Sequence, residues 1–576
     1  SNRQVVSVFL RTGKKMEEKN KENLNLADYL TDSLSLQINT TAPTRCMFPF
    51  TPEDPYLKFV TQDPLEILGE RSFGSPKEIS EDTIGTPIQE FYRGVDVFIT
   101  GATGFLGKIL TEKLIRSIPH IGHVYLLIRS KRGKDSEERF SQLLEDKAFS
   151  RMKAEVPNYL SKIKVVSGDI TEPGLGLSTK DRELLLERVS VVFHGAAKVS
   201  FTEPLTNAIE SIVLGSKRVL ELAKEMQNIK SYIHVSTAYS QCVRRVIEET
   251  VPMMSIDYKK VITYIQSKTD DQLLQETPRL LQGWRNTYVF AKAICESMIQ
   301  EEYGSLPITI FRPSIVLSTY KEPVRGYIDN LYGPVGMLMG AGQGIVHCAL
   351  MSMENYLDSV PADYTANCMI ATAWRTSTIR NSTSSSVYNF TATPVKPILW
   401  KTLIDFGLLK KDIWPFSQAI WYTSFLPTES SLVHEILHWT LQRIPGFFID
   451  KLIELAGHKP ILGKIYQRMY NLTEHTGYYS RRNWEFKNDN VMNLWQDLTP
   501  EDKKLFHFDL RDVDIKEHLL VGKLGIRYYY LKEEMENIPA TNKKNTYLKW
   551  IHRTTKAAFG LLVLKLAVMT ARALPF

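Results

Sequence analysis

Residues 95–107 read Val-Asp-Val-Phe-Ile-Thr-Gly-Ala-Thr-Gly-Phe-Leu-Gly, and this stretch decides the fold. Val95–Thr100 is a mostly apolar run of strand length, and the glycines that follow are spaced GxxGxxG. Lys108–Arg116 then has helical spacing, and Val124–Arg129 is a second apolar run. A strand, a glycine turn, a helix and a second strand form the unit from which parallel sheets are built.

The alternation of strand and helix patterns continues to about residue 400. Four more apolar runs have the length of buried strands, and two amphipathic stretches lie between them: Ile163–Ser167, Val189–His194, Ser231–Ser236 and Ile308–Arg312 as strands, and Leu205–Gln227 and Tyr288–Tyr303 as helices. After Trp400 helical patterns and aromatic residues take over. The sequence therefore predicts an α/β fold: a Rossmann-like, doubly wound parallel sheet, followed by a smaller, mostly helical C-terminal domain and an apolar tail.

These changes of pattern divide the chain of 576 residues into four segments. Residues 1–88 are polar with little periodicity, and we expect a loosely ordered N-terminal extension. Residues 89–400 should form the Rossmann-like domain, residues 401–540 the helical C-terminal domain, and residues 541–576 the tail. A chain of this length exceeds what one hydrophobic core usually organises.

Composition excludes several classes of protein. The net charge of +7, from 71 basic and 64 acidic residues, is small for this length and does not indicate a nucleic-acid partner. The five cysteines are scattered and form no CxxC pair, which argues against a disulfide framework or a zinc knuckle and favours a reducing compartment. The N-terminal residues lack the pattern of a signal peptide, since a short apolar run leads directly into charged residues.

The glycine turn is the first candidate site. Glycines at these positions allow a tight turn and let the backbone approach a pyrophosphate, while the following helix directs free N–H groups at the negative charge. An ordinary strand–helix turn is the alternative, but the surrounding strands favour a dinucleotide. The residues expected to bind it are Thr100, Gly101, Thr103, Gly104, Phe105, Leu106 and Gly107.

The second strand indicates which dinucleotide binds. An acidic residue at its end would favour NAD, whereas this strand ends in Arg129, with three more basic residues within five positions. A guanidinium suits the 2′-phosphate of NADP, so NADPH is the expected cofactor; a solvated basic loop is the alternative. Two further segments are similar to the extended short-chain dehydrogenases, in which Asp169 and Ile170 would meet the adenine and Ala196 would let the cofactor pass. Either could also be a plain strand end.

Tyr288 and Lys292 are the candidate catalytic pair. Four residues apart on a helix, their side chains share one face, and a nearby ammonium would lower the pKa of the phenol. Such a phenol can give a proton to a carbonyl oxygen as hydride arrives. The motif YxxxK is common by chance and could be a solvated helix face, but it follows five strand–helix steps.

The third catalytic residue should follow the preceding strand. Aligning Ser236–Tyr239 with the extended dehydrogenases places Thr237 at the position of the hydroxyl that binds the substrate carbonyl, with Ser236 as the alternative. By the same resemblance, Pro313 and Ser314 would line the nicotinamide. About fifty residues separate Thr237 from Tyr288, and we interpret them as an insertion that shapes the substrate opening.

Over about residues 90–535 the chain resembles the alcohol-forming fatty acyl-CoA reductases of eukaryotes. The motifs that carry the resemblance lie in both predicted domains: Glu90-Phe91-Tyr92, TGATGFLGK, Tyr125–Arg129, Val235–Tyr239, YVFAK, Phe311–Ser314, Gly326–Asn330, Asp358–Asp363, Val387-Tyr388-Asn389, Phe506–Asp509, Gly525-Ile526-Arg527 and Leu531-Lys532-Glu533. Two positions depart from the family pattern. Ile212 stands where an Asn is usual, which could remove a polar anchor of a proton relay, and Tyr327 stands where a Trp is usual.

The resemblance implies a reaction. NADPH would reduce the thioester of a long-chain fatty acyl-CoA, with Tyr288 and Thr237 on the carbonyl oxygen, and a second NADPH would reduce the bound aldehyde to a primary alcohol. No acyl-cysteine is required. A thioester reductase that stops at the aldehyde, a dehydrogenase of another carbonyl and a non-catalytic nucleotide-binding scaffold are the alternatives.

The C-terminal region raises the questions of metal and membrane. His434-Glu435-Ile436-Leu437-His438 fits the HExxH zinc motif, but no third ligand follows at a known spacing, so we expect an amphipathic helix and no metal. Residues 557–571 are apolar apart from Lys565 and threonine, behind a basic segment with Tyr547 and Trp550 at the junction. This tail predicts an interfacial helix or short anchor on a membrane surface.

A helix docked on the protein's own core is the alternative for the tail. The amphipathic region Ile413–Leu455 could help form an acyl tunnel or contact the bilayer. We therefore expect the protein at a cytosol-facing intracellular membrane, either that of the endoplasmic reticulum or that of the peroxisome.

Overall fold

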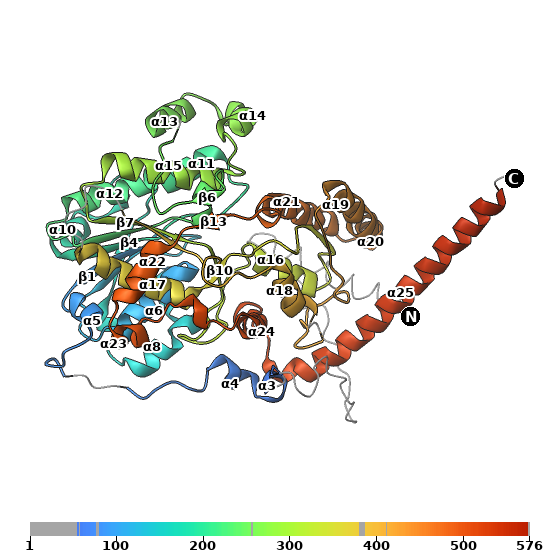
Figure 1. Cartoon of the computed structure of the whole chain (residues 1–576), viewed down its shortest axis with the longest axis horizontal. Coiled ribbons are helices and arrows are strands. Elements are labelled where there is room, and N and C mark those ends of the chain that lie inside the picture. The colour runs from blue at the N-terminus through green and yellow to red at the C-terminus, as the bar shows by residue number, and fades with distance from the viewer. Residues whose placement is uncertain are drawn as a thin grey trace.

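The computed structural model describes residues 55–56, 58–76, 80–254, 257–378, 386–409 and 412–573. The chain forms an α/β body from which one long C-terminal helix projects (Figure 1). The earlier part of the expected N-terminal extension lies outside the described residues.

A seven-stranded parallel sheet forms the centre of the body. Its order is β11-β7-β5-β4-β1-β2-β3, and the bounds are β1 (Asp96–Thr100), β2 (Val124–Ile128), β3 (Ile163–Ser167), β4 (Val189–His194), β5 (Ser231–Val235), β7 (Ile308–Pro313) and β11 (Ser386–Phe390). Thr100, the last residue of β1, pairs with Leu127 on one side and His194 on the other. The order of the strands reverses at β1, and ligands of such sheets bind beyond the carboxyl ends of the strands at this point.

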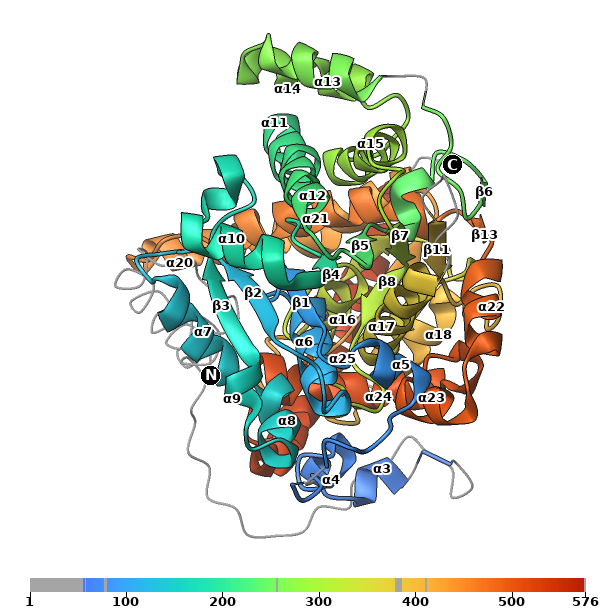
Figure 2. The same cartoon turned by 90° about the vertical axis from the view of Figure 1, so that its left-hand side faces the viewer.

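Helices cover both faces of the sheet (Figure 2). One face carries α6 (Phe105–Ser117) and α17 (Ala362–Thr378), and the other carries α10 (Thr179–Arg188), α12 (Gly215–Glu225) and α15 (Thr287–Glu302). Alternate side chains of β1 therefore enter different cores: Val97 and Ile99 pack with α6, and Phe98 packs with α15. This explains why the strands are continuous apolar runs rather than alternating ones.

The remaining helices before the C-terminal region are mostly short. They are α3 (Lys58–Thr61), α4 (Pro64–Leu68), α5 (Pro87–Phe91), α7 (Ser136–Leu144), α8 (Ser150–Glu155), α9 (Tyr159–Lys162), α11 (Leu205–Ala208), α13 (Tyr258–Gln266), α14 (Asp270–Leu280), α16 (Pro334–Gly342) and α18 (Trp400–Ile404). The C-terminal helices are α19 (Ser431–His438), α20 (Ile444–Leu455), α21 (Leu462–Ser480), α22 (Asp489–Asp497), α23 (Pro500–Leu505), α24 (Ile515–Gly525) and α25 (Ile538–Ala573).

Each of the six strands that the sequence predicts is present, within one residue at either end. The seventh, β11, had no strand signal of its own. The insertion between Thr237 and Tyr288 contains two helices, α13 and α14, and Thr269 ends the turn between them as the N-cap of α14.

The described end of the N-terminal extension is ordered, which differs from the expectation for residues 1–88. Asp63 caps α4, Pro64 occupies its first turn and Gly69 ends it in the left-handed conformation. Ile67 and Leu68 are buried against the main core. Two apolar side chains, fixed by good caps at both ends, suffice to order this short segment.

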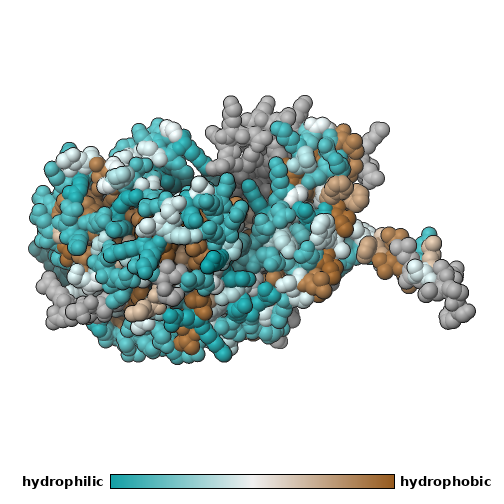
Figure 3. All heavy atoms as spheres, turned by 90° about the horizontal axis from the view of Figure 1, so that it is seen from above, coloured by the Kyte–Doolittle hydropathy of each residue, from teal (hydrophilic) through white to brown (hydrophobic). Residues whose placement is uncertain are grey.

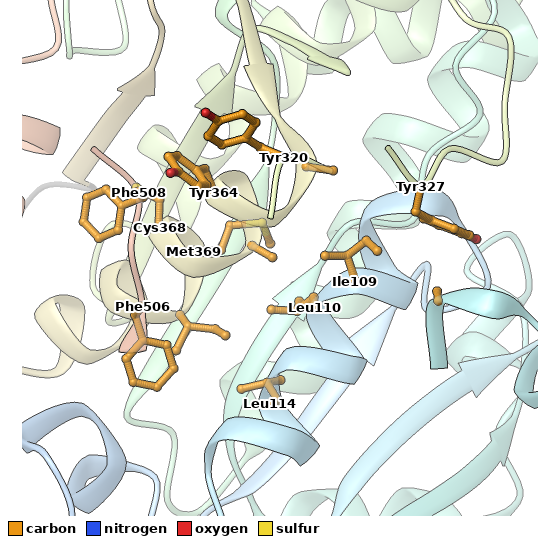
Figure 4. Packing of buried hydrophobic residues seen from close by; sticks show 14 of the residues in the cluster. Ile109, Leu110, Leu114, Tyr320, Tyr327, Tyr364, Cys368, Met369, Phe506 and Phe508 are labelled. Carbon is orange, nitrogen blue, oxygen red and sulfur yellow. The ribbon is translucent and has the colours of Figure 1, made fainter. Parts of the chain in front are cut away.

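The helical C-terminal region shares the core of the sheet domain. Phe506 and Phe508 pack beside Cys368 and Met369 of α17, in the cluster that includes Leu110 of α6 (Figure 4). Two short parallel pairs also join the regions: β6 (Val246–Ile247) with β13 (Glu485–Phe486), and β9 (Cys348–Leu350) with β12 (Leu426–Thr428). The described residues after 400 therefore form one continuous body with the sheet domain.

The long helix α25 begins on the body and then leaves it (Figure 1). Asn545 donates a hydrogen bond to Asp412 over 2.8 Å, and the indole of Trp421 donates to His552 over 2.9 Å. Beyond Arg553 the described side chains are exposed. Docking on the protein's own core thus holds for the first turns of α25 only. Within the part of the chain that was described, no helix has both the length and the apolar content of a membrane crossing.

Candidate active site

A cavity of about 770 Å³ lies beyond the carboxyl ends of the strands. The structure brings every predicted cofactor-binding and catalytic residue to its wall: Thr100, Gly101, Thr103, Gly104, Phe105, Leu106, Gly107, Arg129, Asp169, Ile170, Ala196, Thr237, Tyr288, Lys292, Pro313 and Ser314. These residues come from six strand ends, the first turn of α6 and α15, so the topology brings together residues that are far apart in the sequence. Their individual roles stay predictions.

The glycine turn has no room for a side chain at Gly101 or Gly107. Gly101 has φ +78°, and a Cβ there would lie 2.7 Å from the backbone nitrogen of Ala196. A Cβ on Gly107 would overlap the Gly101 carbonyl and come within 2.8 Å of the Cα of Ala102. No side chain caps the N-terminus of α6, so its first N–H groups remain available. The turn therefore fits a dinucleotide pyrophosphate, which needs a close backbone approach and free helix N–H groups.

A buried hydrogen-bond chain fixes the turn to the neighbouring strand. The hydroxyl of Thr100 lies 2.7 Å from Nδ1 of His194, and Nε2 of His194 lies 2.8 Å from the hydroxyl of Ser216. Burial, with the charge of Lys292 adding to it, lowers the pKa of His194 to about 3. The imidazole is therefore neutral at physiological pH, and its two nitrogens join β1 to α12.

The end of β2 is strongly basic. Arg129 donates to Asp169 over 3.0 Å, and Arg139 donates to the backbone carbonyl of Arg129. Burial and then the charges of Arg129, Arg132, Arg139 and Lys198 lower the pKa of the Lys131 ammonium. Cations that repel one another in this way form a site for an anion. Arg139 also lines the cavity and was missed in the sequence because it lies on α7, ten residues past the strand.

Helix α15 carries the candidate catalytic pair, Tyr288 and Lys292. Asn286 caps it, accepting from the N–H of Val289 over 3.0 Å, and this cap sets where Tyr288 enters the cavity. Lys292 is buried one turn later and donates to the carbonyl of Val235 over 2.7 Å. The ring of Phe201, another residue missed in the sequence, lies 6.4 Å from that of Tyr288.

The pKa of Tyr288 differs from the expectation. Burial raises the pKa of the phenol above its ordinary value, and Tyr332 raises it further, while Lys292 does not lower it. The reason is that the phenol is desolvated, whereas the ammonium is committed to Val235. The phenol therefore stays protonated at physiological pH, which is the form that can give a proton to a substrate oxygen.

The structure distinguishes the two candidate hydroxyls. Both residues line the cavity, but the hydroxyl of Ser236 is taken up by the carboxylate of Glu296, to which it donates over 2.5 Å. Glu296 also accepts from Ser240 and Gln241 at 2.9 Å and pairs with Arg312 at 2.7 Å. Among the described residues, the hydroxyl of Thr237 has one hydrogen-bond partner, the N–H of Tyr239 at 3.3 Å, from which it accepts. Thr237 is thus the better placed of the two to meet a substrate carbonyl.

Glu296 itself was not predicted. It follows Tyr288 and Lys292 at the same four-residue spacing along α15, which is the signal that the sequence did contain. Arg312 overcomes the effect of burial and lowers the pKa of Glu296, so the pair remains ionic.

A second part of the cavity, called the apolar limb from this point on, has an apolar wall. Its wall comes from α16, β9 and α21 and from the residues around them: Met337, Val346, Ala349, Leu350, Met351, Trp400, Met469 and Leu472. Methionine side chains are flexible and adapt to irregular apolar ligands. This limb has the chemistry of a site for an aliphatic chain.

Two expectations about the substrate opening differ from the cavity wall that the structure shows. The region Ile413–Leu455 contributes no residue to that wall, because its α20 packs on α21 and its β12 pairs with β9, and α21 and β9 line the cavity. Contact of this region with a bilayer stays a prediction. Of the described residues between Tyr239 and Tyr288, none lines the cavity either. Helices α13 and α14 of this insertion pack instead on α15 and α11, on the outer side of the body.

The two departures from the family pattern have different settings. Ile212 is buried in the core against the sheet, in a π-helical turn, and the cavity is lined instead by Asn207, Glu210 and Ser211 of the same segment. Position 212 is therefore not a polar anchor here. Tyr327 donates to Asp146 over 2.6 Å and accepts from Lys108 of α6.

The histidines of the HExxH stretch are packing residues. Both are buried, and the ring of Tyr470 lies 5.4 Å from that of His434 and 4.6 Å from that of His438. His434 also contacts Glu474 at 3.2 Å, and His438 contacts Gln442 at 3.2 Å. Among the described residues, no group of three His, Cys, Asp or Glu side chains is arranged to hold a metal ion.

Taken together, the parallel sheet, the glycine turn at its switch point and the cavity define an NAD(P)-dependent oxidoreductase. Residues 99–369 match one domain profile described as male sterility protein, and residues 441–533 match a second with the same description. The terminal R domain from the myxalamid PKS-NRPS biosynthetic pathway shares the fold, with a TM-score of 0.51 and 18% identity over 81% of this chain and 96% of that one.

Curated relatives make the assignment specific. The chain is 37% identical to fatty acyl-CoA reductase wat of Drosophila melanogaster and 34% identical to fatty acyl-CoA reductase 1 of Homo sapiens. Each alignment covers 484 residues, 84% of this chain and 93% of the relative. The chain belongs to the fatty acyl-CoA reductase family, and its activity is fatty acyl-CoA reduction.

Proposed function

We propose that this reductase uses NADPH and carries a long-chain acyl-CoA through a bound aldehyde to the primary alcohol. One observation carries the proposal: a single cavity joins the glycine turn, the Tyr288–Lys292 pair and an apolar limb. None of the four cysteines that the structure describes lines that cavity, which supports direct reduction of the thioester rather than transfer of the acyl group to the enzyme.

The residues of the cavity supply proton transfer and orientation. When bound, the reduced nicotinamide supplies a hydride to the carbonyl carbon. Tyr288 donates its phenolic proton to the carbonyl oxygen, and the hydroxyl of Thr237 donates a hydrogen bond to the same oxygen. Lys292, one helical turn away, holds the end of β5 against α15 by donating to the carbonyl of Val235, two residues before Thr237.

The first reduction gives a hemithioacetal. Its C–S bond breaks, its hydroxyl proton passes to the sulfur, and the aldehyde remains while the coenzyme A thiol leaves. A second round of hydride and proton transfer at the same residues gives the primary alcohol. Two hydrides and two protons are consumed for each thioester.

Product analysis tests this sequence. Purified protein is given a long-chain acyl-CoA with excess NADPH, and aldehyde, alcohol and NADPH consumption are quantified. We expect alcohol and two NADPH per thiol released, and no turnover in Tyr288→Phe. Aldehyde alone with one NADPH per thiol would establish the aldehyde-forming alternative, and unchanged turnover in Tyr288→Phe would remove the catalytic assignment.

The preference for NADPH is supported by the basic end of β2. Arg129 and Arg139 lie at the cavity beside Asp169, and the charges around Lys131 repel one another. A 2′-phosphate would relieve this repulsion. We expect kcat/KM to favour NADPH over NADH by at least tenfold, and Arg139→Ala to reduce that ratio. An equal preference in the wild-type protein would contradict the assignment.

We further propose that the protein works on the cytosolic surface of an intracellular membrane, of the endoplasmic reticulum or the peroxisome. Apolar side chains gather at the end of the molecule from which α25 projects (Figure 3). They come from α19, the π-helical turn Trp439–Arg443, α20 and α25, and include Leu432, Ile436, Trp439, Phe447, Phe448, Leu455, Trp550, Phe559, Leu561, Leu562 and Leu564, all exposed. An exposed apolar area of this kind fits a lipid surface.

Vesicle flotation tests the membrane proposal. The full chain should float with liposomes of phosphatidylcholine and phosphatidylserine, whereas a variant with Leu561, Leu562 and Leu564 replaced by Ser should float less. Replacing the exposed Leu160 and Leu274 by Ser is the control and should change nothing. Equal flotation of all three proteins would exclude α25 as the anchor, and imaging of the tagged full chain identifies the organelle.

A further inference from the structure

Two arginines from distant parts of the chain lie over one tyrosine ring near the cavity. The Cζ atom of Arg285 is 4.8 Å from the centroid of the Tyr478 ring, and that of Arg482 is 4.1 Å from it. Arg285 lies just before α15, Tyr478 lies in the last turn of α21, and both arginines are exposed. Within the described residues, neither arginine forms an ion pair with a carboxylate.

Aromatic contacts connect this pair of arginines to the catalytic tyrosine. The ring of Tyr288 lies 6.4 Å from that of Phe201, which lies 6.4 Å from that of Tyr479, which lies 5.2 Å from that of Tyr478. Phe201 and Tyr479 line the cavity. The Tyr478 ring is therefore at most about 18 Å from the ring of Tyr288.

The surroundings of the ring are positively charged. The hydroxyl of Tyr478 donates a hydrogen bond to the carbonyl of Cys242 over 3.0 Å. Two and three positions after Cys242 come the exposed Arg244 and Arg245. The charge of Arg285 adds to burial in lowering the pKa of His475. Unpaired guanidiniums held in place by an aromatic ring are well suited to phosphate groups, which they can bind in a bidentate manner.

We propose that Arg285 and Arg482, held over Tyr478, bind the phosphates of the coenzyme A part of the substrate while the acyl chain fills the apolar limb. This rests on the acyl-CoA reductase activity of the chain. The arm between the sulfur and the pyrophosphate of coenzyme A has thirteen bonds and spans about 15 Å when extended, at the rise that backbone bonds show. A charge-assisted hydrogen bond adds about 3 Å, so a thioester beside Tyr288 can bring its phosphates to the two arginines across the separation of at most about 18 Å.

The two arginines have a second explanation, which the test must separate. Arg482 also donates to the carbonyl of Tyr478 over 3.4 Å, and cations at the C-terminus of a helix stabilise it. If that were their whole role, their loss would lower thermal stability and leave substrate affinity unchanged.

The experiment compares two thioesters of the same acyl chain, one with coenzyme A and one with N-acetylcysteamine, which has no phosphate. In the full chain carrying Arg285→Ala and Arg482→Ala, KM for the acyl-CoA should rise by about tenfold or more, a typical effect of losing charge-assisted hydrogen bonds. KM for the N-acetylcysteamine thioester and turnover of a long-chain aldehyde should not change. Arg285→Lys with Arg482→Lys should recover part of the affinity.

The control variant is Arg188→Ala. Arg188 is exposed and is the last residue of α10, immediately before β4 begins. It therefore lies near the amino ends of the strands, whereas the cavity lies beyond their carboxyl ends. Its loss should leave both KM values unchanged. Raising the salt concentration should weaken acyl-CoA binding in the wild-type protein more than in the double variant, because phosphate contacts are screened.

Three outcomes would overturn the proposal. The first is an equal rise of KM for both thioesters, and the second is no rise for either. The third is a lower Tm with unchanged affinity, which would show that the arginines only stabilise the C-terminus of α21. Equilibrium binding of coenzyme A itself to the wild-type protein and the double variant gives the same comparison without turnover. A failure of the reductase activity and a failure of this site therefore give different results.

Discussion

Replacing Glu296 by Ala should destabilise the protein strongly, although Glu296 touches no substrate. Its carboxylate pairs with Arg312 at 2.7 Å, and the exposed fraction of both side chains is 0%. Without Glu296, the guanidinium keeps only the carbonyls of Glu248 and Thr250, each at 3.0 Å, and the side-chain oxygen of Asn389 at 3.5 Å. Removing one partner of a fully buried ion pair typically costs about 3–5 kcal/mol.

The size of the effect on Tm follows from the length of the chain. At about 2.1 cal per mole per kelvin for each residue, a cooperative unit of about 500 residues has an unfolding entropy near 1 kcal per mole per kelvin. A loss of 3–5 kcal/mol should therefore lower Tm by about 3–5 °C, measured by tryptophan fluorescence on the full chain. The value of kcat should also fall, because Glu296 holds Ser236, the residue before Thr237.

A double variant provides the control and the refutation. Glu296→Leu with Arg312→Met replaces the ion pair by apolar groups and should regain part of the lost Tm, since no charge is left buried alone, although Ser236, Ser240 and Gln241 still lose their acceptor. A fall of less than 1 °C for Glu296→Ala would refute the reasoning. So would a double variant whose loss equals the sum of the two single variants.

Three further predictions follow. Gly107→Ala should abolish binding of the dinucleotide, measured by fluorescence quenching, because its Cβ would overlap the Gly101 carbonyl; Gly560→Ala, which meets nothing within 4 Å, should bind normally. Thr237→Val should lower kcat at least tenfold with unchanged NADPH affinity, Thr237→Ser should retain activity, and an equal loss in both would contradict the role of the hydroxyl. Burial, with the charge of Arg527, lowers the pKa of Lys523 to about 7, so the folded state binds fewer protons than the unfolded state from about pH 7 to 10.5. The Tm of the wild-type protein should therefore rise relative to that of Lys523→Met between pH 6.5 and 9.5, and a constant difference would disprove the shift.

Much of the fold could be predicted from the sequence because each core strand is buried on both faces. Such strands are continuous apolar runs, and the glycine turn fixes which of them comes first. Strand β11 was not predicted because its five residues follow a Ser-rich stretch and include the polar Asn389. The amide of Asn389 is buried and donates to the carbonyls of Ile247 and Lys487. A polar residue in a strand carries no apolar signal, even when its hydrogen bonds are complete.

The parts of the site that sequence reasoning missed depend on long-range contacts. Arg139, Phe201 and Glu296 reach the cavity or its wall from helices and loops whose orientation no local pattern specifies. The raised pKa of Tyr288 could not be predicted either. The spacing to Lys292 is local, but the desolvation of the phenol is a property of the closed body.

The pairing of β6 with β13 has a consequence for biosynthesis. Val246 and Glu485 are 239 positions apart in the chain. At about 5–20 residues per second, a ribosome would need roughly 10–50 seconds to deliver the second strand after the first. During that interval the nascent polypeptide exposes an unfinished edge beside the future catalytic centre, so we expect it to require chaperone protection until synthesis is almost complete.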